Sequence, residues 1–338
     1  MESISSRHRT AVGILMGAPY SLLVILLAIV GHFLREWSFL HLVSGIVTYL
    51  ILPLSFVVEE SPRWLAQSGQ GHKAAQQLLR AADNDKVALP PHLVATLDKV
   101  QVFPEKDAPG EVVNQGSTTN FLRQFRDFPS SFCVLLTTAA LWFFLALMYF
   151  SVMLNSSYFS STSAEMYVGL SGGLEAVAVL VVMPVTQRLG RRLVMGVGPI
   201  LCGSLLVANL FVPEDLVWLR WLVVMGAMFL ICAAYQVMVL YITEVFPTVI
   251  RSRGLGFSSF VGFLGSIAAP LVIDLLVQVV WWGSGMVMGV TGAVIALIVY
   301  FLPETNNTTL PDTLQDLENL RNRKKPPVTP PPPPPHSV

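Results

Sequence analysis

Long apolar runs, each of about 20 residues, constrain this chain more than any other feature of its sequence. A helix of about that length crosses the roughly 30 Å of hydrocarbon in a bilayer. Hydrophobic residues make up 53% of the chain and charged residues 12%, against about 25% charged in soluble domains, so a soluble fold could not bury this surface. The sequence therefore predicts an all-α polytopic membrane protein with the lipid bilayer as its surroundings. The eight predicted spans are 10–34, 37–58, 132–154, 166–187, 193–213, 221–243, 254–273 and 281–302.

The basic residues orient these spans, because Lys and Arg accumulate in cytoplasmic loops. Of the 21 Lys and Arg residues, only Arg35 and Arg220 fall in short connections on one side, and the others lie on the opposite side. We therefore expect both termini in the cytoplasm. The formal net charge is zero, and no cluster of basic and aromatic residues indicates a nucleic-acid partner.

An internal repeat divides the chain. Glu2 stands seven residues before Arg9 and 58 before Glu60, while Glu244 stands seven before Arg251 and 60 before Glu304. Each copy encloses two spans, but four further spans precede only the second copy. By the symmetry of transporter halves, about four helices are expected upstream of this sequence in a complete carrier.

Four segments follow from this arrangement. We expect 1–58 to hold the last two helices of an N-terminal half, and 132–305 to form a six-helix C-terminal half. Residues 59–131 are predicted to form a cytosolic loop. Within this loop, residues 72–82 and 91–103 have helix-like apolar spacing, and aromatic residues are interleaved with arginines at 120–128. Residues 306–338 form a cytosolic tail rich in proline.

Enzyme chemistry finds no support in the sequence. The six histidines are scattered, and GxSxG, P-loop and HExxH motifs are absent. Cys133, Cys202 and Cys232 form no CxxC pair, so we expect free, buried thiols and neither a metal site nor a cofactor. The tail PPVTPPPPPPHSV favours polyproline II and could bind an SH3 or WW domain. Asn155 heads a glycosylation sequon on the expected outer side.

Four strings at the expected helix boundaries carry a resemblance to a known family. VEESPRWLAQSG (58–69), QRLGRR (187–192), YITEVFPTVIRSRGLG (241–256) and LPET (302–305) resemble signature segments of the solute carrier 22 family, the organic cation, anion and zwitterion transporters of the major facilitator superfamily. The resemblance implies an N-terminally shortened member, for which an orphan branch is one alternative, with a partial major facilitator fold whose spans correspond to helices 5 to 12. It also implies a plasma-membrane carrier that moves small organic ions by alternating access.

The sequence departs from the family pattern at three positions. Glu59 replaces a usual Pro, and Gln187 stands where Asp is common. Phe263 aligns where anion transporters resemble one another in an Arg and cation transporters in an Asp, so the charge of the substrate stays open.

Candidate substrate-binding residues lie within the spans. Glu175 is a carboxyl inside an apolar run, which usually faces a cavity or a partner, and it matches an acidic position of the cation-transporting members. Aromatic faces attract organic cations, although a carboxyl bonded within the bundle and ordinary packing aromatics would give the same pattern. The candidates are Trp142, Tyr149, Glu175, Tyr235, Gln236 and Phe263.

Paired glutamates and arginines at the cytoplasmic helix ends form a second set. Carboxylates facing Arg forks can lock one side of a carrier while the other side opens, whereas positive-inside topology alone would explain the arginines but not the glutamates. The predicted gating residues are Glu2, Arg9, Glu60, Arg63, Arg188, Arg191, Glu244, Arg251 and Glu304.

Two classes of function are compatible with these features. The first is transmembrane transport of small organic ions, by this chain as a shortened isoform or as part of a longer protein. The alternative is a non-transporting receptor or regulatory, transporter-like membrane protein, which an incomplete cavity and the uncharged Phe263 would favour.

Overall fold

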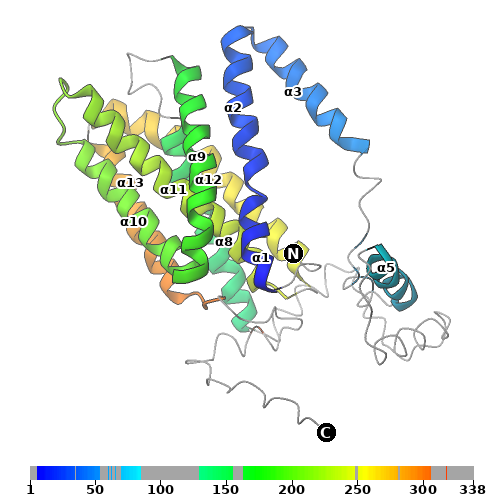
Figure 1. The fold of residues 1–338 in the computed structure, drawn as a ribbon. Helices are drawn as coiled ribbons and strands as arrows, with labels where there is room; N and C mark the ends of the chain where they lie inside the picture. The colour runs from blue at the N-terminus through cyan, green and yellow to red at the C-terminus, as the bar shows by residue number, and fades with distance from the viewer. Residues whose placement is uncertain are drawn as a thin grey trace.

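The computed structural model describes residues 6–34, 36–53, 60, 62, 65, 70–84, 129–154, 163–247, 250–280, 282–305 and 317. All of the regular structure in these ranges is helical (Figure 1). The helices are α1 (Ser6–Leu15), α2 (Ala18–Phe33), α3 (Trp37–Ile51), α5 (Gly71–Asn84), α8 (Pro129–Met153), α9 (Ala164–Leu189), α10 (Arg191–Asn209), α11 (Val217–Val245), α12 (Arg251–Val279) and α13 (Gly283–Phe301).

Membrane-spanning length is reached by 7 helical stretches among the described residues. They match seven of the eight predicted spans, which confirms the all-α polytopic class. The remaining prediction, 37–58, coincides with α3 over Trp37–Ile51, and its last residues lie outside the described ranges. Pro184, Pro199 and Pro270 sit inside helices, as expected where neighbouring helices satisfy the freed backbone groups.

The first predicted span, 10–34, is confirmed as a stretch of spanning length over Thr10–Phe33, but a turn interrupts it. Helix α1 ends at Leu15 and α2 begins at Ala18, with a turn at Met16 and Gly17 between them. Pro19 explains the break, because its ring would clash with the carbonyl of Leu15 four residues earlier and it has no N–H to donate. The turn places Gly17 inside the bundle, where it contributes to the site described below.

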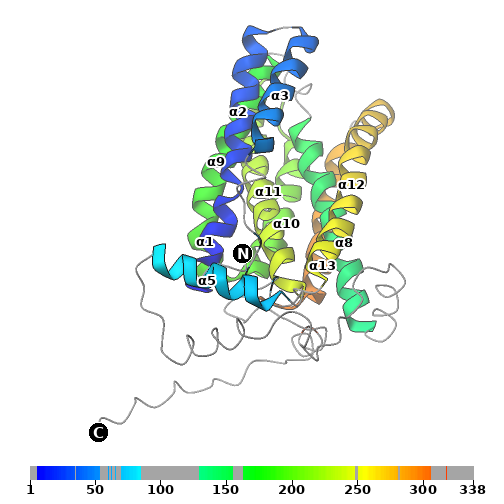
Figure 2. The ribbon, with the colours of Figure 1, turned by 90° about the vertical axis from the view of Figure 1, so that its right-hand side faces the viewer.

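Helices α8 to α13 pack into one bundle, in which α8 contacts α12 and α10 contacts both α11 and α13. Helix α2 runs along α9, and α1 contacts α9 and α11, so the first spanning segment joins the bundle on one side. Helix α3 turns back from the far end of α2 and diverges from the bundle in Figure 1. Helix α5 lies below α3 and to the side of the bundle in Figure 1, so in Figure 2 it stands in front of the bundle. Helix α5 confirms the helix predicted at 72–82.

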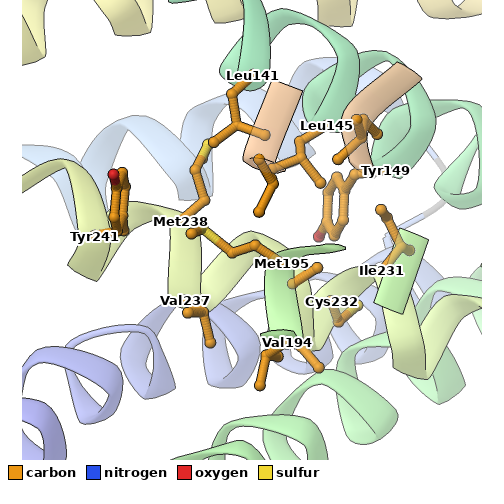
Figure 3. Packing of buried hydrophobic residues seen from close by; sticks show 14 of the residues in the cluster. Leu141, Leu145, Tyr149, Val194, Met195, Ile231, Cys232, Val237, Met238 and Tyr241 are labelled. Atoms are coloured by element: carbon orange, nitrogen blue, oxygen red, sulfur yellow. The ribbon is translucent and has the colours of Figure 1, made fainter. Parts of the chain in front are cut away.

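The bundle interior is apolar and closely packed. Figure 3 shows Leu141 and Leu145 of α8 facing Ile231 and Met238 of α11, with Met195 of α10 between them. Because lipid tails are as apolar as these side chains, van der Waals packing rather than water exclusion favours such contacts in a membrane. This rigid interior fixes where α8, α9 and α11 present their polar side chains.

Several predictions stay untested or need correction. The expectation of free thiols holds for all three cysteines, but Cys133 is exposed, so its predicted burial is wrong. It lies at the start of α8, where the helix surface faces outward. The segments 91–103 and 120–128, the proline tail at 326–338 and Asn155 lie outside the described residues and stay predictions.

Candidate substrate and gating sites

A carboxyl group lies buried at the meeting point of three helices. Glu175 of α9 is 2% exposed. One of its oxygens accepts a hydrogen bond from the hydroxyl of Tyr149 on α8 at 3.2 Å, and the other accepts from Nε2 of Gln236 on α11 at 3.2 Å. Three residues that the sequence singled out separately thus form one hydrogen-bonded group.

Two further predicted residues extend this group. The rings of Tyr149 and Tyr235 lie 5.0 Å apart and are tilted by 30°, and Nε1 of Trp142 donates to the hydroxyl of Tyr235 at 3.1 Å. Trp142 and Tyr149 stand seven residues apart on α8 and so share a face of that helix, and both contact Tyr235. We call Trp142, Tyr149, Glu175, Tyr235 and Gln236 the central cluster.

Two glycines make room for the central cluster. A Cβ atom at Gly17 would overlap the amide of Gln236, and one at Gly262 of α12 would overlap the indole of Trp142. A glycine costs about 0.5–1 kcal/mol relative to Ala inside a helix, so Gly262 is retained at a cost to the helix itself. Gly17 lies in the turn between α1 and α2, so this turn packs directly against the central cluster.

The charge of Glu175 has no counter-charge in the described part of the chain. Its two hydrogen-bond donors, Tyr149 and Gln236, are neutral, and the ion pair seen elsewhere in the bundle does not involve it. An isolated ionised carboxylate buried away from water is costly. The group therefore suits a site that holds either a proton or a cationic ligand.

Phe263 does not share this buried environment. It lies on α12 next to Gly262, and its side chain is 65% exposed. The described residues thus supply five of the six predicted substrate-binding residues as one cluster and leave Phe263 on the surface of the bundle.

A second polar cluster lies at one end of the bundle, where α10 begins and α11 ends. The guanidinium of Arg191 binds both carboxylate oxygens of Glu244 at 3.1 Å, and both side chains are 4% exposed. Thr305 donates to Glu244 at 2.8 Å, and Arg191 donates to the hydroxyl of Thr10 on α1 at 2.6 Å. Fork-to-carboxylate pairs of this kind are among the stronger polar contacts in proteins.

Helices α10 and α13 cap one another beside this pair. Glu304, just after α13, accepts from the backbone N–H of Arg191 at 3.1 Å and of Arg192 at 3.2 Å. In return the Arg192 guanidinium donates to the carbonyls of Val299 and Tyr300 at 3.2 and 2.6 Å. A carboxylate at a helix N-terminus and a cation at a C-terminus are both favourable. Gly190, with φ of +88°, forms the tight turn against Glu304.

We call Thr10, Arg191, Arg192, Glu244, Glu304 and Thr305 the Arg191 cluster. It unites three predicted gating residues, Arg191, Glu244 and Glu304. Arg188 is exposed at the end of α9, and Nε of Arg251 donates to the Phe246 carbonyl at 3.1 Å. Glu60 is exposed. The side chain of Arg9, and the whole of Glu2 and Arg63, lie outside the described residues.

No metal site emerges from the part of the chain that the structure describes, since no three His, Cys, Asp or Glu side chains there could share an ion. Both clusters consist of polar side chains in the bundle that are held by hydrogen bonds, and one of them also by an ion pair.

Comparison with known proteins gives these two clusters a context. The model of the sugar (and other) transporter family matches residues 8–316. Solute carrier family 22 member 3 of Rattus norvegicus is 30% identical over 322 residues, which cover 94% of this chain and 55% of that protein. Member 6 of Danio rerio is 28% identical, and the organic cation transporter protein of Drosophila melanogaster 27% identical, with 94% of this chain covered in both. The chain spans about half the length of the curated relatives it matches.

Solved structures agree on the fold. The proton:xylose symporter XylE of the major facilitator superfamily, bound to 6-bromo-6-deoxy-D-glucose, matches with a TM-score of 0.68 at 17% sequence identity. That match covers 94% of this chain and 68% of the symporter. The inward-open xylose transporter XylE from E. coli matches less well, with a TM-score of 0.52. The chain is therefore an integral membrane protein with a partial major facilitator fold that belongs to the sugar (and other) transporter family, and its relatives are members of solute carrier family 22.

Proposed function

We propose that this chain forms part of an alternating-access carrier for small organic ions, and that the carrier prefers organic cations. The observation that carries the proposal is the buried carboxyl of Glu175, which is bonded only to neutral donors and surrounded by aromatic side chains. An organic cation would supply the missing positive charge, and the faces of Tyr149, Tyr235 and Trp142 would add roughly 0.5–2 kcal/mol each.

The Arg191 cluster is proposed as the lock on the cytoplasmic side. Its bond from Arg191 to Thr10 joins the C-terminal six-helix unit to α1, which belongs to the first unit. Alternating access requires such contacts between the two units to form and break while each unit stays rigid. The mutual capping of α10 and α13 would keep the C-terminal unit rigid, so the Thr10 bond is the contact that would break.

We propose that both termini face the cytoplasm, on the basis of the distribution of Lys and Arg. Single cysteines introduced at 35 and at 160 should react with a membrane-impermeant maleimide in intact cells, whereas cysteines at 110 and at 330 should react only after permeabilisation. Labelling of position 110 from outside would reverse the proposed orientation and with it the side of the lock.

Uptake into liposomes tests the proposed function. We expect the longest natural form of the protein that contains this chain to accumulate a radiolabelled quaternary ammonium compound in a saturable manner, because the central cluster offers a limited number of sites. A neutral compound of the same shape should compete weakly. Binding of the cation without any uptake would contradict the proposal of a carrier and favour the alternative of a non-transporting receptor.

A further inference from the structure

A small cavity lies inside the six-helix unit at the end opposite to the Arg191 cluster. It is formed where α8, α10, α11, α12 and α13 converge, and its volume is about 60 Å³. Ser151 on α8 follows Tyr149 by two residues, a rotation of roughly 200° around a helix. The cavity therefore lies behind α8 as seen from the central cluster, and the proposed substrate site does not include it.

The cavity contains polar atoms that have no partner. Ser151 is 1% exposed, and its Oγ forms no hydrogen bond within the described residues; the same holds for Oδ1 of Asn209 on α10. Leaving a buried donor or acceptor unsatisfied is destabilising. A molecule with a polar group in this cavity would recover that cost.

The remaining walls define what such a molecule can be. Val224, Ile273 and Met288 are apolar and buried, and the described residues that line the cavity carry no charge. A charged ligand would find no counter-charge there. A water molecule needs about 10–15 Å³ of such a volume, so the cavity has the size of a cluster of about four to six waters, or of a three- or four-carbon alcohol.

We propose that this cavity binds a small uncharged molecule that carries a hydroxyl or amide group on a short apolar part. The polar group bonds to Ser151 and Asn209, and the apolar part contacts Val224 and Met288. Entry is beside the end of α10, where Leu206 and Leu210 are half-buried and line the cavity. Because α8 carries Tyr149 on its other face, a molecule bound here supports α8 from behind the central cluster.

Photolabelling tests the proposal on the purified full chain in liposomes, with a diazirine derivative of a four-carbon alcohol as the probe. We expect adducts at 151–152 of α8 or 206–210 of α10, and at least a fivefold decrease when excess 1-butanol competes. Ser151→Ala should weaken labelling about threefold, because one hydrogen bond contributes about 0.5–1.5 kcal/mol. The control Ser266→Ala, whose hydroxyl already donates to the Phe263 carbonyl at 2.8 Å, should leave labelling unchanged.

Two outcomes would overturn the proposal. Adducts absent from both segments would mean that the cavity holds water only. Adducts that neither 1-butanol nor Ser151→Ala reduces would mean that the probe reacts from the lipid. The thermal unfolding temperature of Ser151→Ala, measured in parallel, separates lost binding from lost folding, since removing an unsatisfied buried hydroxyl should not lower it.

Discussion

Replacing Arg191 by Met should lower the free energy of unfolding by about 3–5 kcal/mol, because it leaves a buried carboxylate without its partner. Glu244 is 4% exposed and loses both bonds from the guanidinium, while Thr305 alone cannot neutralise its charge. Thr10 loses its bond to the C-terminal unit at the same time. The measurement is unfolding of the purified chain in mixed micelles as the fraction of denaturing detergent rises.

Two companion variants show whether the ion pair causes this loss. The double variant Arg191→Met with Glu244→Leu removes both charges, and pairs replaced in this way are often neutral or even stabilised, so it should regain at least half of the lost stability. Arg188→Met changes an exposed arginine three residues away and should stay within about 0.5 kcal/mol of the parent. Equal losses in Arg191→Met and in the double variant would show that packing, not charge pairing, holds the cluster together.

Replacing Glu175 by Gln should weaken binding of an organic cation by at least tenfold and binding of a neutral analogue by less than twofold. The change keeps the shape of the side chain and one acceptor oxygen for its two donors, Tyr149 and Gln236, but removes the charge. Two unit charges 4 Å apart attract by about 4 kcal/mol at an effective dielectric constant of about 20. Since about 1.4 kcal/mol is tenfold in affinity, even a third of that attraction produces the expected loss.

A substitution at Phe263 tests the charge preference from a second position. Phe263→Arg places a positive charge on α12 next to Gly262, at a position that is exposed in the described bundle. If Phe263 faces the substrate path, this variant should shift preference from cations toward anions.

Cation affinity unchanged in Glu175→Gln would show that the carboxyl is structural, and the charge preference would then come from residues outside this chain.

Charge made the main features of both sites predictable from the sequence. Glu175 interrupts an apolar span, and Arg191, Glu244 and Glu304 recur at helix ends, so each could be singled out without a structure. The hydroxyl partners of the Arg191 cluster could not. Thr10 and Thr305 are neutral hydroxyl residues near helix ends, which is where such residues occur for many reasons, and only the packing of α1 against α9 and α11 brings Thr10 to Arg191.

The same limit applies to the fold. Hydropathy located the spans, because length and apolar character decide whether a helix can cross a bilayer, but it gave no sign of the turn at Gly17. That turn depends on Pro19. Its role in the site depends on Gln236, more than 200 positions away in the sequence, whose amide occupies the space that a side chain at residue 17 would fill. Gly262 and the unpaired hydroxyl of Ser151 have functional meaning only through helices that are distant in sequence.

The most direct test of the central claim is equilibrium binding of a matched pair of ligands to the longest natural form of the protein. One ligand is a quaternary ammonium compound, and the other is its neutral analogue with carbon in place of nitrogen, so shape and apolar area are nearly equal. With Glu175 as the counter-charge, the cation should bind at least tenfold more tightly, and Glu175→Gln should abolish this difference. Equal affinities of the two ligands for the parent protein would contradict the account, because the buried carboxyl would then contribute no charge to recognition.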